Sequence, residues 1–200
     1  MPHPGSKRQQ ATTGAVVEVT TSSVEETQAL GERIGRMLQP GDVVALRGEL
    51  GSGKTTLIQG IARGLGRDPE TIKSPTFVLM REYPGDVPLV HLDGYRLEGA
   101  PAVSWLDLDL IFSPLKITLI EWAERFADLL PADHLRIDLD HVSTNRRRLR
   151  VSATGSRSTE ILLALRAAQP RDDASASTQT MTTPSSASRT PNSPNAPPCD

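Results

Sequence analysis

The stretch Gly48-Glu49-Leu50-Gly51-Ser52-Gly53-Lys54-Thr55-Thr56 has the pattern G-x-x-x-x-G-K-[ST], which is typical of a phosphate-binding P-loop. The five residues before it, Val43 to Arg47, form a short apolar run and predict a buried strand. After the loop, apolar residues recur at helical spacing from Leu57 to Leu65. Strand, glycine-rich loop and helix N-terminus therefore follow one another in the order that phosphate binding requires.

The residue types in this stretch suit the binding of a nucleoside triphosphate. Glycines allow the backbone to form a concave nest of N–H groups, and a helix beginning at Lys54 adds free donors and the positive end of its dipole. We expect Lys54 to face solvent before nucleotide binds and then to contact the β- and γ-phosphates, and Thr55 to be a ligand of Mg²⁺. The predicted nucleotide contacts in the loop are Leu50, Gly51, Ser52, Gly53, Lys54, Thr55 and Thr56.

Length and composition favour one domain with two polar tails. The chain has 200 residues, of which 37% are hydrophobic. Residues 1–14 are polar, and residues 169–200 consist mainly of Ser, Thr, Pro, Ala, Asn and Asp. Such segments bury too little apolar surface to offset the entropy of ordering, so both tails are expected to be disordered. The ordered domain is expected to cover residues 15–168.

Charge and cysteine content narrow the class of protein. The formal net charge of −2 gives no broad basic surface for nucleic acid, so we expect no DNA partner. Cys199, in the C-terminal tail, is the only cysteine, which excludes a disulfide framework and fits a reducing compartment. No secretory signal and no apolar run of 18 residues occur in the sequence. We expect a cytoplasmic protein without a membrane partner.

The order of predicted elements indicates an α/β fold. Strands are expected at 16–20, 43–47, 78–83, 89–93 and 117–121, and a late antiparallel hairpin at 134–140 and 147–153. Helices are expected at 23–38, 54–64 and 159–168, with one or two short helices in 97–113 and another after Trp122. Together they predict a single P-loop NTPase domain with a mixed, mostly parallel sheet flanked by helices.

Two carboxylates end predicted strands, where open α/β sheets bind their ligands. Asp93 follows Leu89 to Leu92, as in a Walker B strand, and Glu121 follows the more apolar run Ile117 to Ile120. Either residue alone is often just the first solvated position after a strand. Because both occur in one P-loop protein, we expect at least one to bind Mg²⁺ or orient the attacking water.

Several further residues have both a structural and a functional interpretation. The hydroxyls of Ser74 and Thr76 flank Pro75 in a loop that is either a γ-phosphate sensor or an ordinary turn. His91 is more often a packed side chain than a base, and Trp122 either stacks on a base or fills the core. Arg96 is a candidate for stabilising charge, although a salt bridge is commoner. GTPase activity is disfavoured because neither D-x-x-G after a strand nor N-K-x-D occurs.

Four motifs together resemble the TsaE (YjeE) family, the ATPases of bacterial tRNA threonylcarbamoyladenosine synthesis. They are the P-loop, Lys73-Ser74-Pro75-Thr76-Phe77, His91-Leu92-Asp93-Gly94-Tyr95-Arg96-Leu97 and Glu121-Trp122, in the family's order. The resemblance runs from about Val16 to Leu165. Two departures are Gly94, where the family usually has Leu, and the acidic segment 105–110, where many relatives have a Gly-centred turn.

The resemblance implies a Mg²⁺-dependent ATPase that is required for forming the threonylcarbamoyl group on adenosine 37 of tRNA. It would act as an accessory subunit of the TsaB–TsaD transferase and contact tRNA only indirectly. The resemblance assigns Mg²⁺ binding to Thr55 and Glu121, and hydrolysis to Asp93. It also places Thr27 and Arg146 near the nucleotide. With these assignments the catalytic candidates are Lys54, Asp93 and Thr76, and Trp122 is counted among the nucleotide contacts.

Two other classes of function stay open at this point. Many single-domain P-loop proteins are small-molecule kinases, although residues 97–113 lack the paired arginines of a typical kinase lid. A third possibility is a nucleotide-gated binding module in which hydrolysis is incidental. Measuring phosphate release with and without TsaB–TsaD distinguishes the three.

Overall fold

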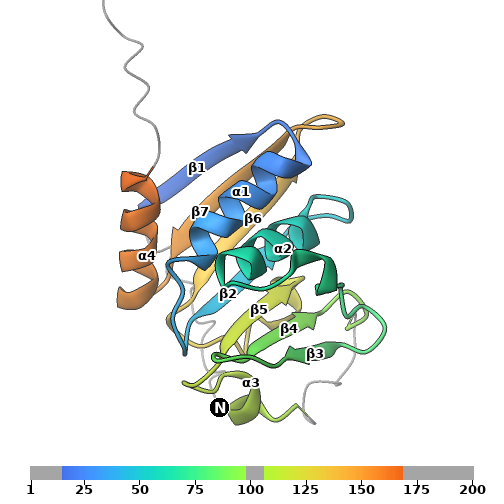
Figure 1. Cartoon of the computed structure of the whole chain (residues 1–200), viewed down its shortest axis with the longest axis vertical. Coiled ribbons are helices and arrows are strands. Elements are labelled where there is room, and N and C mark those ends of the chain that lie inside the picture. The colour runs from blue at the N-terminus through green and yellow to red at the C-terminus, as the bar shows by residue number, and fades with distance from the viewer. Residues whose placement is uncertain (1–14, 98–105, 169–200) are drawn as a thin grey trace, which may run out of the picture. The chain divides into compact units, whose positions relative to one another are not determined.

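The computed structural model describes residues 15–97 and 106–168, and the two predicted tails lie outside these ranges (Figure 1). A seven-stranded sheet has the order β1-β7-β6-β2-β5-β4-β3. Its strands are β1 (Val16–Thr21), β2 (Val43–Arg47), β3 (Met80–Tyr83), β4 (Leu89–Asp93), β5 (Ile117–Glu121), β6 (Leu135–His141) and β7 (Arg147–Ala153). The helices are α1 (Val24–Gly35), α2 (Lys54–Gly64), α3 (Leu108–Ile111) and α4 (Ser156–Ala167), with 3-10 turns at Pro69–Thr71 and Ala123–Phe126.

The predicted mixed α/β sheet with a late hairpin is confirmed. Strands β6, β2, β5 and β4 are parallel to their neighbours in that order and form the centre of the sheet. The outer pairs β1–β7, β6–β7 and β3–β4 are antiparallel. Parallel pairs therefore make up half of the six strand pairs and are confined to the centre, where every residue of β4 and β5 is buried.

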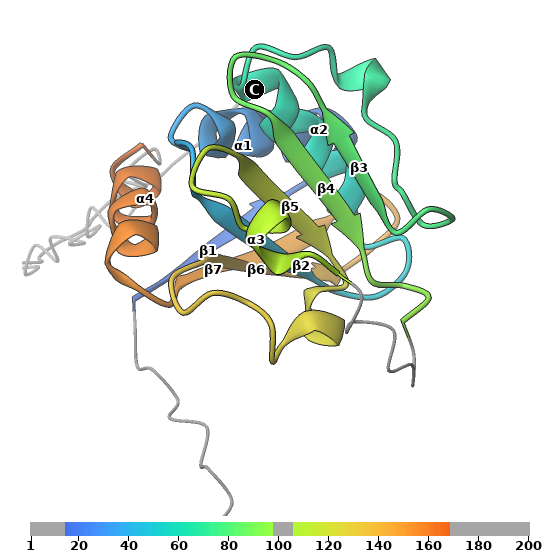
Figure 2. The same ribbon diagram turned by 90° about the horizontal axis from the view of Figure 1, so that it is seen from below.

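Apolar side chains on the two faces of β2 enter two different cores. Val44 and Leu46 pack into the larger cluster with residues of α1, α2 and α4, whereas Val43 and Ala45 face α3 and the turn at Ala123–Phe126. Figures 1 and 2 show α1 and α2 side by side and α4 near β1 and β7. The P-loop helix is therefore held between α1 and the central strands.

Glycines bring α1 and α2 into backbone contact. A Cβ atom added at Gly31 would lie 2.3 Å from the Leu57 carbonyl oxygen, and one added at Gly60 would lie 2.2 Å from that of Gln28. Distances this short exclude any side chain at either position. The pair of helices therefore packs more closely than larger residues would permit, and this close packing supports the helix that begins at Lys54.

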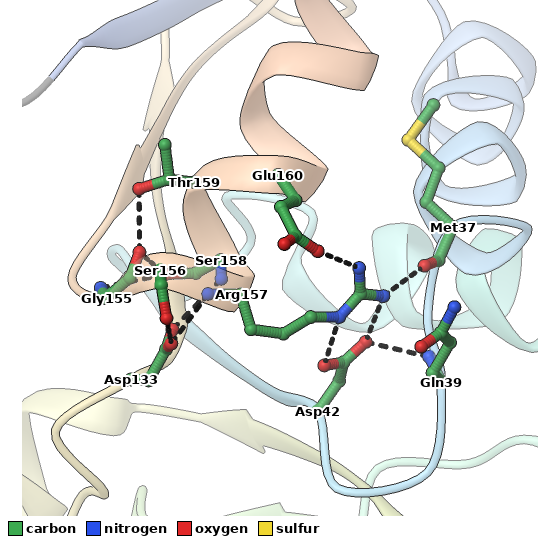
Figure 3. A network of polar contacts seen from close by, with 10 residues as sticks. All are labelled: Met37, Gln39, Asp42, Asp133, Gly155, Ser156, Arg157, Ser158, Thr159 and Glu160. Carbon is green, nitrogen blue, oxygen red and sulfur yellow. Dashed lines mark hydrogen bonds and ion pairs between the residues drawn. The ribbon is translucent and has the colours of Figure 1, made fainter.

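Helix α4 begins at Ser156, three residues before the predicted start at Thr159. The Asp133 carboxylate accepts hydrogen bonds from the backbone N–H groups of Arg157 at 2.8 Å and Ser158 at 3.0 Å, so a distant residue caps the first turn (Figure 3). The Arg157 guanidinium donates to both Asp42 oxygens, at 3.1 and 3.0 Å. These contacts join α4 to the segment that enters β2.

One strand boundary needs correction. Strand β3 begins at Met80, because Val78 and Leu79 turn back to donate to the Pro75 carbonyl and Leu79 takes a positive φ of 66°. In the predicted helical region 97–113 the described helix is α3, while residues 98–105 lie outside the described ranges. Within the described residues, no helix has the length and apolar character to cross a membrane.

Candidate functional site

The P-loop lies between the end of β2 and the start of α2, as predicted. Gly48, Gly51 and Gly53 have positive φ angles of 142°, 77° and 103°, which is the region that glycine alone enters without strain. At Gly48 a side chain is also excluded by the Leu139 carbonyl oxygen, which would lie 2.3 Å from an added Cβ. The loop leads directly into α2 at Lys54, so the free N–H groups of the first turn open towards the same space.

A cavity of about 650 Å³ lies at this loop. Most of the predicted site residues line it, although they come from five separate parts of the chain. They are Thr27, Leu50, Gly51, Gly53, Lys54, Thr55, Thr56, Thr76, Asp93, Glu121 and Trp122. The carboxyl ends of β2, β4 and β5 thus meet at one cavity, which is where a parallel sheet places its ligand.

Two predicted contact residues do not line this cavity. Ser52 lies in the P-loop but is completely buried, and its hydroxyl has no hydrogen-bond partner among the described residues. In the β6–β7 turn the cavity is lined by Arg147 and not by Arg146. Arg147 Nη1 donates to the carbonyl oxygens of Ser143 at 3.0 Å and Thr144 at 3.1 Å, which holds its guanidinium beside the P-loop.

The sequence prediction also missed a group of cavity residues. They are Ser23, Val24, Glu25, Tyr95, Thr144 and Asn145, besides Arg147. Ser74, one of the two hydroxyls of the candidate γ-phosphate sensor, also lines the cavity. Ser23 is the N-cap of α1, where its hydroxyl accepts from the Glu26 N–H at 3.1 Å. The cavity thus includes the first turn of α1, and the buried Thr27 hydroxyl lies 2.8 Å from that of Thr21.

Thr55 and Glu121 bring two oxygen-bearing side chains together. The Thr55 hydroxyl lies 2.8 Å from Glu121 Oε1 and 3.0 Å from Oε2, and Glu121 Oε1 lies 3.0 Å from His91 Nε2. Among the described residues, no group of three or more His, Cys, Asp and Glu side chains forms a metal site. One hydroxyl and one carboxylate suit Mg²⁺, which typically takes one or two carboxylates and completes its shell with phosphate oxygens and water.

Lys54 does not face solvent. Its side chain is buried, and Nζ donates to the carbonyl oxygens of Gly48 at 2.7 Å and Glu49 at 3.0 Å. Nζ also lies 4.1 Å from the centre of the Trp122 ring, a cation–π contact. Burial lowers the pKa of Lys54 below its usual value, and the charges of Glu121, Glu124, Asp93 and Glu49 oppose this shift only in part. Any anion that binds Lys54 would have to replace these two carbonyl oxygens as partners of the amine.

Asp93 connects two loops at the cavity. Its Oδ2 accepts from the hydroxyls of Ser74 and Thr76, both at 2.5 Å, and its Oδ1 accepts from the Tyr95 N–H at 2.9 Å. The Asp93 side chain is buried, so these three donors replace solvent around the carboxylate. The loop at Ser74–Thr76 is thus more than a surface turn, because both of its hydroxyls point at a carboxylate that lines the cavity.

Two aromatic side chains, Tyr95 and Trp122, line the cavity beside Asp93 and Glu121. Trp122 takes a left-handed backbone conformation, with φ of 55° and ψ of 44°, and its ring lies 5.2 Å from that of Tyr95. Arg96 lies over the ring of the exposed Phe77 at 4.3 Å and does not line the cavity. Trp122 therefore does not fill the core. It lies at the cavity wall, where its ring contacts Lys54 and Tyr95.

Fold and site together define a P-loop protein of the α/β class. Residues 21–149 match the model of the family described as threonylcarbamoyl adenosine biosynthesis protein TsaE. Because this match covers more than half of the chain, the chain belongs to the TsaE family.

Individual relatives agree with this family. The chain is 38% identical over 138 residues to the tRNA threonylcarbamoyladenosine biosynthesis protein TsaE of Bacillus subtilis, covering 68% of this chain and 85% of that protein. It is 45% identical over 115 residues to the protein of the same name from Streptomyces coelicolor, covering 56% and 76%. The crystal structure of Bacillus subtilis YdiB matches with a TM-score of 0.66 and 32% identity, over 78% of this chain and 98% of YdiB.

Proposed function

We propose that this protein hydrolyses ATP to ADP and phosphate with Mg²⁺, and that hydrolysis supports the formation of threonylcarbamoyladenosine at position 37 of tRNA. The observation that carries the proposal is the Thr55–Glu121 pair directly beside the P-loop. A hydroxyl from the first helical turn and a strand-end carboxylate are the side chains that P-loop enzymes use for Mg²⁺. The names of the relatives supply the link to tRNA modification.

We assign separate roles in nucleotide binding and hydrolysis to the residues around the cavity. The P-loop N–H groups and Lys54 bind the phosphates, while Thr55 and Glu121 hold Mg²⁺, which neutralises charge on the β- and γ-phosphates when bound. In this proposal Asp93 orients the attacking water, and Thr76, which donates to Asp93, holds that carboxylate in position. Thr27, Trp122 and the β6–β7 turn form the remaining walls for the nucleotide.

The proposed partners are the TsaD and TsaB homologues of the same cell, with tRNA reached only through them. This places the protein in the cytoplasm, where tRNA is modified. The proposal treats ATP hydrolysis as an accessory reaction that supports the transferase, and it does not require a tRNA-binding surface on this chain. The chain's net charge of −2 agrees with indirect contact, since nucleic-acid binding usually relies on a basic surface.

Phosphate release by the full chain tests the proposal, measured with Mg²⁺ and ATP in the presence and absence of purified TsaB and TsaD. We expect release that rises when TsaB–TsaD is added and stops when Mg²⁺ is chelated. A small-molecule kinase would release little phosphate under either condition and would need an acceptor. A nucleotide-gated module would bind TsaB–TsaD in a nucleotide-dependent way without faster hydrolysis. Either result would contradict the proposed function.

A further inference from the structure

His91 lies on the strand next to that of Glu121, the proposed metal ligand, and its side chain contacts the Glu121 carboxylate. It is the middle residue of β4, its side chain has no exposed surface, and its Nε2 is 3.0 Å from Glu121 Oε1. The register of the parallel pair β4–β5 aligns His91 with Leu119 and Asp93 with Glu121. The imidazole and the carboxylate therefore project from neighbouring strands on the same face of the sheet, the face covered by α2.

Only one of the two imidazole nitrogens is paired. Nδ1 is buried without a hydrogen-bond partner among the described residues, whereas Nε2 meets the Glu121 carboxylate. A neutral imidazole carries one N–H donor and one acceptor, and a buried N–H without an acceptor loses its hydrogen bonds to water without replacement. The arrangement that avoids this cost has the proton on Nε2, where the carboxylate accepts it. His91 then donates to Glu121.

Glu121 consequently has donors on two sides. Its Oε1 accepts from His91 Nε2 within the sheet, and both of its oxygens lie within 3.0 Å of the Thr55 hydroxyl at the cavity. A carboxylate on a flexible glutamate side chain otherwise turns about its terminal bonds. The His91 donor restricts this rotation and, since His91 itself does not line the cavity, leaves the carboxylate accessible to a metal ion there.

We infer that His91 is a positioning residue for Glu121, which orients the carboxylate for Mg²⁺ without touching nucleotide or metal itself. The inference rests on the proposed function, in which Thr55 and Glu121 hold Mg²⁺. Residues that hydrogen-bond a metal ligand typically change metal affinity about 10–100-fold when they are replaced. A histidine that merely fills space in β4 would have no such selective effect on metal binding.

The test uses Mn²⁺ and ADP with the full chain. Free Mn²⁺ is measured by electron paramagnetic resonance, and ADP affinity is measured separately in EDTA. We expect His91→Leu to weaken Mn²⁺ binding to the ADP complex by about 10-fold or more and to leave metal-free ADP affinity unchanged. His91→Gln, whose amide nitrogen can reach the position of Nε2, restores most of the Mn²⁺ affinity.

Thr118→Val is the matched control. Thr118 is a buried polar residue of the adjacent strand β5, and its hydroxyl donates to the Ile111 carbonyl at 2.6 Å without contacting Glu121. We expect it to lower thermal stability while leaving Mn²⁺ affinity at the wild-type value. Equal Mn²⁺ affinity in wild type and His91→Leu would overturn the inference, as would equal losses of Mn²⁺ and metal-free ADP affinity in His91→Leu.

Glu121→Gln separates failure of this inference from failure of the proposed function. If Glu121→Gln binds Mn²⁺ normally, the proposed metal site is wrong. If Glu121→Gln weakens Mn²⁺ binding and His91→Leu does not, only the role of His91 is wrong. The imidazole ¹⁵N resonances of the wild-type protein report which nitrogen of His91 carries the proton. Comparison with His91→Gln assigns the His91 signals. A proton on Nε2 supports the inference, and a bare Nε2 beside a protonated Nδ1 overturns it.

Discussion

The hydroxyl of Thr55 lies 2.8 Å from one oxygen of the Glu121 carboxylate and 3.0 Å from the other, joining the first turn of α2 to the end of β5. The two residues are 66 positions apart in the chain. They meet because β2 and β5 are parallel neighbours, so the helix that follows β2 begins above the end of β5. This contact joins the phosphate-binding loop to the proposed metal ligand.

Replacing Glu121 by Gln is expected to raise the Mg²⁺ concentration that half-saturates ATP hydrolysis by about 10-fold or more, because the amide loses the negative charge that attracts the ion. The measurement is a Mg²⁺ titration of phosphate release at saturating ATP. Glu82→Gln is the control, since Glu82 lies on β3, pairs with Lys116 and does not line the cavity. An unchanged Mg²⁺ requirement in Glu121→Gln would contradict the assignment of this residue.

Replacing Asp93 by Asn is expected to reduce turnover by about 100-fold or more, as for the loss of a general base, with ADP affinity largely kept. The asparagine oxygen can still accept from Ser74 or Thr76, so the loops stay joined while the charge is lost. Single-turnover kinetics and ADP binding measure the two effects separately. A shifted Mg²⁺ requirement with normal single-turnover rate would instead identify Asp93 as a Walker B metal ligand and reverse its role with Glu121.

Gly31→Ala is expected to destabilise the protein by about 1–3 kcal/mol or more, because the added methyl group overlaps the Leu57 carbonyl oxygen in α2. In an uncrowded helix a Gly→Ala change stabilises the protein by roughly 0.5–1 kcal/mol. A loss of stability in Gly31→Ala therefore indicates close contact between α1 and α2. Urea denaturation measures it. A gain in stability would show that α1 and α2 do not approach as closely as described.

Asp133→Ala is expected to cost about 1 kcal/mol at neutral pH through loss of the cap of α4. Burial alone raises the pKa of Asp133, but hydrogen bonds from the Ser158 hydroxyl, the backbone of Ser158 and Arg157, and Ser156 outweigh it and lower the pKa below the usual 3.8. The stabilisation is therefore fully present well above pH 3.8 and is lost as the pH falls through the lowered pKa.

Urea denaturation of wild type and Asp133→Ala from pH 7 downward measures this dependence. The difference in unfolding free energy should shrink only in the acid range. Asp128→Ala is the control, because it replaces an exposed carboxylate in the same connection between the turn Ala123–Phe126 and β6. A difference that stays constant to the lowest accessible pH would show that the Asp133 charge does not contribute to the cap.

Sequence patterns predicted the parts of the site that depend on local chemistry and on sheet topology. The P-loop is recognisable because its glycines, strand and helix are adjacent in the chain. Asp93 and Glu121 are recognisable because both follow buried strands, and parallel strands bring such positions to one edge. No spatial information was needed to expect these three elements at one cavity.

The remaining features depend on contacts between distant segments. Lys54 points inward to the Gly48 and Glu49 carbonyl oxygens and contacts the ring of Trp122. Trp122 has a left-handed backbone conformation that is uncommon outside glycine. Arg147, the first residue of β7, lines the cavity, whereas Arg146 lies in the turn before it and bonds Ser143 through its backbone. The sequence alone does not define where this turn ends. The early start of α4 depends on Asp133, 23 residues before Ser156, which no helix-start pattern includes.

Lys54→Ala tests most directly the claim that ATP hydrolysis at this loop supports tRNA modification. The variant is compared with wild type and with Lys73→Ala, which removes an exposed lysine outside the cavity. Phosphate release and threonylcarbamoyladenosine in tRNA are measured together in a reaction containing TsaB, TsaD, tRNA and threonylcarbamoyl donor. We expect a folded Lys54→Ala protein to lose at least about 100-fold in phosphate release and to form no more modified tRNA than a reaction without this protein. Normal phosphate release or normal tRNA modification by folded Lys54→Ala would contradict the account.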